Sequence, residues 1–251
     1  MPSRRLPNSI PAVIRTCIKA RDTYKNTPVP ADRAISAALF ALLDDADPLS
    51  LLNRQIKEAS DVDLAEAAQA PLSTNLKVSA ASLTTHCSHF HQVLDMGITR
   101  GAFAAGARAY YGRDVGADSI PPLTTYDEVA TAAGNIVTGE AARATAEGAG
   151  YVPMALPSAA EVGTVRAQFT TLRNQQQQAF VNTDTQREEA MALYPESQAL
   201  AVDICDTVEF FYRKDPDASS RRQKCERWGV VYIFEPGEPG APPANPPAPN
   251  P

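Results

Sequence analysis

The densest group of potentially reactive side chains lies in segment 86–91, which holds all three histidines of the chain and one of its four cysteines. Imidazole nitrogen and thiolate sulfur are preferred ligands of Zn²⁺ and related ions, so His86, Cys87, His89 and His91 are the candidate metal ligands. Successive residues of a helix turn by about 100°, and the four side chains would span about 200° of its surface. One helix therefore cannot close a mononuclear site with them.

A metal site in this segment would need carboxylates from elsewhere. The acidic set on a neighbouring helix is Asp203, Asp206 and Glu209, and the same helix of a second subunit is the other possible source. The simpler interpretation makes Cys87 a small core residue and the histidines amphipathic surface on either side of it. A metal-binding bundle therefore stays the alternative to a protein without a cofactor.

Catalytic signatures are lacking elsewhere in the chain. A thiolate nucleophile needs an adjacent base, which His91 could supply to Cys87, or a histidine of the long helix to Cys205, but no oxyanion loop accompanies either pair. The sequence contains no Gly-rich phosphate loop, no GxSxG elbow and no HExxH motif. We expect a protein that is not an enzyme.

The net charge and the cysteine content limit the expected partners and the expected cellular compartment. The net charge is −6, and the only dense basic run is 221–227, which argues against nucleic acid as a partner. No run of about 18 apolar residues is present, so no membrane span is expected. Prolines interrupt the N-terminus before any signal-like apolar stretch, and four scattered cysteines suggest reduced thiols. These features favour a cytoplasmic location, with export by a non-classical route left open.

Helical periodicity dominates the elements that would position these residues. Residues 1–70 predict short helices, one of them opening at Asp47-Pro48, and the proline-free stretch 72–111 predicts one long helix. The second half of that helix is rich in glycine and alanine, which indicates close approach of a facing helix at Gly101.

Two further helical stretches complete the predicted bundle over residues 71–214. Residues 126–147 predict one helix, and Ser158 with Glu161 has the spacing of a capping box at the start of the next. Pro195 leaves two readings of 158–213 open, one kinked helix or a hairpin. The predicted fold is all-α, an elongated up-and-down helical bundle.

The C-terminal region has a different character. Residues 215–235 form an aromatic arm with a short basic helix and one strand, 230–234, while 236–251 hold eight prolines in 16 positions and predict a disordered tail. Because the bundle offers the strand no partner, we expect it to pair between chains in a homo-oligomer or to lie across bundle helices. The predicted interaction residues are Trp228, Val230, Val231, Tyr232, Ile233 and Phe234.

Two segments carry a resemblance to other proteins. Ala104-Ala105-Gly106-Ala107-Arg108-Ala109-Tyr110-Tyr111-Gly112, together with Phe211-Tyr212-Arg213-Lys214-Asp215-Pro216 and its continuation through Arg227-Trp228-Gly229-Val230-Val231-Tyr232, resembles recurring segments of uncharacterised bacterial helical proteins. The resemblance covers residues 72–235 and implies a helical fold. It implies no activity. Together with the unpaired C-terminal strand, this leads us to expect a structural or interaction protein that self-assembles through that strand.

Overall fold

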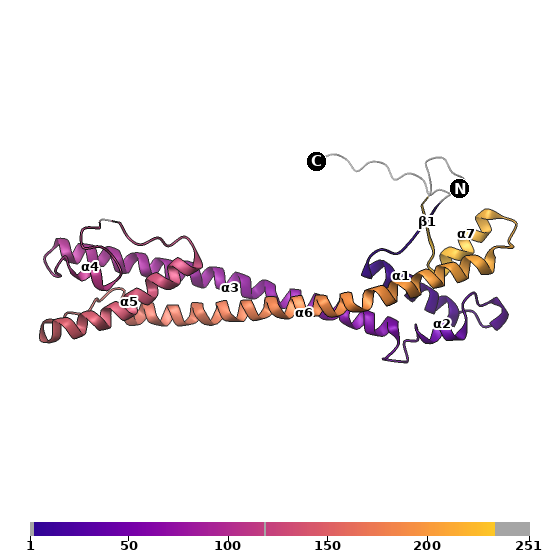
Figure 1. The fold of residues 1–251 in the computed structure, drawn as a ribbon, viewed down its shortest axis with the longest axis horizontal. Coiled ribbons are helices and arrows are strands. Elements are labelled where there is room, and N and C mark those ends of the chain that lie inside the picture. The colour runs from indigo at the N-terminus through magenta and orange to yellow at the C-terminus, as the bar shows by residue number, and fades with distance from the viewer. Residues whose placement is uncertain (1–2, 118, 234–251) are drawn as a thin grey trace. The chain divides into compact units, whose positions relative to one another are not determined.

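Helices and one small sheet make up the regular structure (Figure 1). The computed structural model describes residues 3–117 and 119–233. Within those ranges the predicted all-α bundle is confirmed, while Phe234 and the predicted tail 236–251 lie outside them. In chain order the elements are β1 (Ser3–Arg5), α1 (Ile10–Lys25), η1 (Pro30–Asp32), α2 (Ala37–Ala41), α3 (Leu51–Thr99), α4 (Ala107–Tyr110), α5 (Tyr126–Glu147), η2 (Gly148–Gly150), α6 (Ala159–Tyr212), α7 (Ala218–Arg227) and β2 (Val231–Ile233).

The chain forms two compact units. The terminal unit combines 1–64 with 184–251, and the central unit is 65–183. This division differs from the predicted one because both ends of the chain belong to the same unit. Helices α3 and α6 each contribute one part to the terminal unit and the other part to the central unit.

The core of the terminal unit joins helices from both ends of the sequence. Cys17 of α1, Ile204 of α6 and Trp228 after α7 are buried in one apolar cluster. The Trp228 indole Nε1 donates a hydrogen bond to the Tyr212 hydroxyl at 3.1 Å, which satisfies the buried N–H group. The predicted aromatic arm therefore shares its packing with the N-terminal helices.

The core of the central unit lies between α3, α5 and α6. Leu83 and Phe90 of α3 pack with Ile136 of α5 and Phe169 of α6. Helix α5 begins at the predicted residue with a reciprocal capping box of Thr125 and Glu128.

Helix α6 begins as predicted and resolves the alternative that Pro195 left open. The Glu161 carboxylate accepts hydrogen bonds from the Ser158 N–H at 2.7 Å and from the Ser158 hydroxyl at 3.0 Å. The helix then runs without a break from Ala159 to Tyr212 with Pro195 inside it, so this stretch is one helix and not a hairpin.

Helix α3 departs from the predicted boundaries at both ends. It starts at Leu51 and continues through Pro71, so the expected short helix and the long one are a single element. It ends before Gly101, whose φ of +74° forms the left-handed turn of a Schellman motif, with the Ala102 N–H donating to the Gly97 carbonyl at 2.8 Å. A Cβ at Gly101 would meet nothing within 4 Å, so the expected contact with a facing helix is wrong.

The close approach between backbones occurs at Gly139 instead. A Cβ on this α5 residue would overlap the Tyr110 carbonyl of α4 and would lie 2.9 Å from the Tyr111 ring. Only glycine leaves room for α4 at this distance, because any side chain would push the two helices apart. This glycine lies outside the small-residue stretch for which a close approach was predicted.

The C-terminal strand pairs with the N-terminus of its own chain. Strands β1 and β2 are antiparallel, with Arg4 opposite Tyr232 and Arg5 opposite Val231. We expected the chain to contain no partner for this strand. That expectation is wrong, because strand β1, which precedes α1, pairs with β2. Such a short polar stretch has no alternation of apolar residues that would have indicated a strand.

Candidate interaction site at the chain termini

The histidine segment lies in α3 of the central unit, and its members face different surroundings. Cys87 is fully buried, as predicted, but His91 is fully buried too, so the expectation that all three histidines lie on the surface is wrong. Neither ring nitrogen of His91 has a hydrogen-bond partner, whereas the Nδ1 of His86 lies 2.8 Å from the Ser82 carbonyl oxygen. His91 lies four residues after Cys87 and three before Leu94, so it falls on the same buried face of α3.

Burial keeps these groups in their uncharged forms. Burial lowers the pKa of His91 to about 4, with a further lowering by the nearby Arg113 guanidinium and an opposing effect of Asp95. Burial likewise raises the pKa of the Cys87 thiol to about 11 and that of Cys205 to about 11. A thiol protonated at neutral pH is neither a ready nucleophile nor a ready metal ligand.

The structure does not assemble the hypothetical metal site. In residues 3–117 and 119–233, no group of three or more His, Cys, Asp or Glu side chains is arranged to hold a metal ion. The carboxylates considered as further ligands belong to the terminal unit, where the Arg4 guanidinium binds Asp206 and lies 3.1 Å from Glu209. No observation on the described residues therefore favours metal binding.

A buried polar network in the central unit is the most elaborate cluster of titratable groups. The Arg143 guanidinium donates to the Tyr111 hydroxyl at 2.8 Å and to the Glu140 carboxylate at 3.1 Å. Glu140 also accepts from the hydroxyls of Tyr111 and of Tyr151, and from the Met154 N–H at 3.0 Å. Burial alone would favour the neutral acid, but these donors hold the pKa of Glu140 below its usual value.

This network closes on itself. The Arg143 guanidinium also donates to the Glu147 carboxylate at 3.2 Å and to the Val152 carbonyl oxygen at 2.7 Å. The hydrogen-bonding groups of Arg143 and of its partners are therefore satisfied within their own chain. A fully satisfied buried network fixes the packing of α4 against α5. Its chemistry is that of a structural element, because its donors and acceptors are already paired.

The terminal ladder, β1 with β2, presents a different arrangement. Its inward side chains are anchored, since the Tyr232 hydroxyl donates to Glu209 at 2.7 Å and Arg4 binds the same carboxylate. Just before β2, Gly229 has a φ of +97° and lies so close to α1 that a Cβ would be 2.7 Å from the Thr16 carbonyl oxygen. Glycine is required here, and it brings β2 down onto α1.

The outward side of the terminal ladder remains open. Val231 and Ile233 are each 50% exposed, and in the described part of the chain the sheet has only two strands, so each strand keeps one edge without a backbone partner. Of the other predicted interaction residues, Trp228 and Val230 are buried in the core and Tyr232 is half-buried against Glu209. Exposed apolar side chains on an open strand edge form a surface suited to strand addition.

A cavity of about 230 Å³ opens beside this ladder. It is lined by strand β1, the turn into α1, residues 12–19 of α1 and the start of β2, and three basic residues, Arg5, Arg15 and Lys19, contribute to this lining. Reasoning from sequence missed this site. Its signal was the spacing of Arg15 and Lys19, four residues apart on one helix face, but the role of Arg5 depends on the pairing of β1.

Comparisons of the chain with protein-family models, with curated proteins and with solved structures found no match. No helix within the described ranges is both long and apolar enough to cross a membrane.

Proposed function

We propose that this chain is a non-enzymatic interaction protein that binds a second copy of itself through the terminal ladder. The observation that carries the proposal is the pair of open strand edges beside the exposed side chains of Val231 and Ile233. Open edges of this kind are templates for pairing, which natural proteins usually cover or use.

The absence of activity is supported by the state of the candidate catalytic groups. Burial raises the pKa of the Cys17 thiol to about 12, in line with the raised values of Cys87 and Cys205. The buried acid and base cluster around Glu140 and Arg143 is satisfied internally. Neither arrangement leaves a free nucleophile or a free general base for a substrate.

A second copy is the occupant that best fits the ladder. Antiparallel pairing of β2 with β2 of another chain around a two-fold axis would make a continuous four-stranded sheet. The same contact would cover the apolar side chain of Ile233, and each copy would present the same patch to the other. Three-residue strands give few hydrogen bonds, so we expect association that depends on protein concentration.

The test is the molar mass of the full chain as a function of concentration, measured by light scattering. The wild-type chain is expected to shift from monomer toward dimer, and Ile233→Lys is expected to remain monomeric, since it places a charge in the proposed contact. Leu49→Lys is the matched control, because Leu49 is 78% exposed in the same unit and distant in sequence from either strand.

Truncation after Trp228 would be a poorer test, because it would also remove Val230, a buried core residue. Full-length protein that stays monomeric at high concentration would contradict the proposal. So would a dimer that Ile233→Lys and Leu49→Lys leave equally intact.

A further inference from the structure

We infer that the cavity beside the terminal ladder is a binding site for a phosphoryl group, either free phosphate or a small phosphate ester. The inference is independent of self-association, since it concerns the cavity and not the strand edge. Its basis is that three cationic side chains line this cavity together with neutral groups that can donate hydrogen bonds.

The described residues around the cavity carry only positive charge. Arg5, Arg15 and Lys19 line it, and among the residues of 3–117 and 119–233 no aspartate or glutamate does so. None of the three forms a salt bridge or side-chain hydrogen bond with any residue of the described ranges. Three like charges held near one cavity repel one another, and an anion between them would remove that repulsion.

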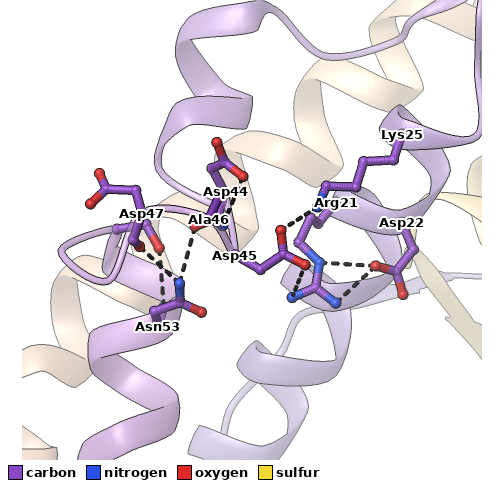
Figure 2. Close-up of polar contacts among 9 residues, drawn as sticks. Arg21, Asp22, Lys25, Asp44, Asp45, Ala46, Asp47 and Asn53 are labelled. Atoms are coloured by element: carbon purple, nitrogen blue, oxygen red, sulfur yellow. Dashed lines mark hydrogen bonds and ion pairs between the residues drawn. The ribbon is translucent and has the colours of Figure 1, made fainter.

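Arg21 and Lys25, which lie farther along α1 than the cavity residues, show how paired basic residues are arranged in this unit. Figure 2 shows Arg21 bonded to Asp22, with guanidinium-to-carboxylate contacts of 2.8 and 2.9 Å, and Lys25 bonded to Asp45. These partners come from α1 itself and from the loop before α3. Within the part of the chain that the structure describes, no carboxylate pairs with Arg15 or Lys19, so their charges remain available to a ligand.

Neutral donors add to the same cavity. Asn8 and Ser9 line it, and the Ser9 side chain makes no capping hydrogen bond to α1. The first turn of α1 holds no acidic residue, and Ala12, whose N–H group belongs to that turn, also lines the cavity. N–H groups of a first helical turn have no acceptor within the helix and favour an anion there.

This combination fits a phosphoryl group better than a carboxylate. A phosphate monoester carries a charge of about −1.5 to −2 at pH 7 and offers three acceptor oxygens, which matches several cationic and neutral donors. Arginine binds phosphate oxygens through two parallel N–H groups, and lysine adds a point charge. The whole chain carries a net charge of −6, so attraction of an anion has to come from this local cluster.

The experiment is isothermal titration calorimetry of the full chain at pH 7.5 and low salt, with inorganic phosphate, glycerol 2-phosphate and acetate as separate probes. The double variant Arg15→Gln/Lys19→Gln removes two charges from the lining, while Arg54→Gln/Lys214→Gln removes two from elsewhere in the same unit. Circular dichroism checks that each variant retains the helical content of the wild type.

We expect saturable phosphate binding to the wild type, weakened at least about tenfold by Arg15→Gln/Lys19→Gln and less than about twofold by the control. Tighter binding of the ester would assign an ester ligand, and equal or tighter binding of inorganic phosphate would assign the free ion. Absence of saturable phosphate binding, acetate binding as tight as phosphate, or equal losses in both double variants would overturn the inference.

Discussion

The buried Arg143 network of the central unit and the basic cavity of the terminal unit use their charged side chains in opposite ways. In the central unit, Arg143 is buried and bonded to Glu140, and Asp95 accepts from the Arg113 guanidinium at 2.9 and 3.0 Å. In the terminal unit, Arg15 and Lys19 lie exposed at a cavity without a partner in the described chain. Paired buried charges constrain a fold, whereas unpaired exposed charges add little stability and remain free for a ligand. The difference indicates a structural role for the first set and a binding role for the second.

The largest effect is expected from breaking the central network. Replacing Arg143 by Met leaves the buried Glu140 carboxylate without its cation, which should cost about 3–5 kcal/mol in the free energy of unfolding. Arg15→Met is the matched control and should change it by less than about 0.5 kcal/mol, because that guanidinium is exposed and unpaired. Urea denaturation followed by circular dichroism measures both. Equal losses in unfolding free energy would contradict the distinction between the paired Arg143 and the unpaired Arg15.

Acid should destabilise the central unit through His91. Its pKa is about 4 in the folded protein against an ordinary value of 6.5, so the unfolded chain binds the proton first as the pH falls. The stability associated with neutral His91 is complete above pH 6.5 and is lost progressively toward pH 4, by up to about 3 kcal/mol.

The variant His91→Leu isolates this contribution from other groups that titrate in the same range. It removes the two unpaired ring nitrogens while filling a similar volume, so we expect a flatter dependence of unfolding free energy on pH between 6.5 and 4. Parallel profiles for the wild type and His91→Leu would show that burial does not perturb this histidine.

A smaller loss of stability should distinguish alanine substitutions at two glycines of α5. Gly139→Ala forces a methyl group against the Tyr110 carbonyl and should cost about 1–3 kcal/mol. Gly134→Ala meets only the flexible end of Arg166, at 3.3 Å, and should be neutral or stabilising because alanine favours a helix. Melting temperatures of the two variants would check the comparison, and similar values would argue against close contact between α4 and α5.

The smallest effect is expected at the exposed end of the histidine segment. The double change His86→Gln/His89→Gln should alter the free energy of unfolding by less than about 0.5 kcal/mol, because neither side chain is buried. Elemental analysis of the same preparations tests the metal alternative separately. Stoichiometric metal in the wild type that the double variant loses would make this segment the functional site.

Local signals predicted the elements whose ends and faces are set by nearby residues. The capping box of Ser158 and Glu161 and the buried seam through Leu83 and Phe90 could be predicted directly, because caps and helical periodicity act over a few residues. Helix α3 could not be bounded in this way, since it continues through Pro71, and a proline inside a helical pattern usually marks its end.

The candidate site was harder to predict because its parts are far apart in the sequence. Nothing near Val231 indicates that Arg5 lies opposite it, and that pairing is what places Arg5 beside the cavity with Arg15 and Lys19. The burial of His91 is different, because a local signal was present. His91 lies four residues after Cys87 and three before Leu94, and this helical spacing places it on the same buried face of α3.

Hydrogen exchange of the β2 backbone as a function of protein concentration is the most direct measurement of the central claim, that the terminal ladder is an open binding surface. Amide protection across residues 229–233 should rise with concentration in the wild type and not in Ile233→Lys, while residues 107–111 of the central unit serve as an internal reference that does not change. Protection of β2 that is independent of concentration, or that changes in parallel with the reference, would contradict the account.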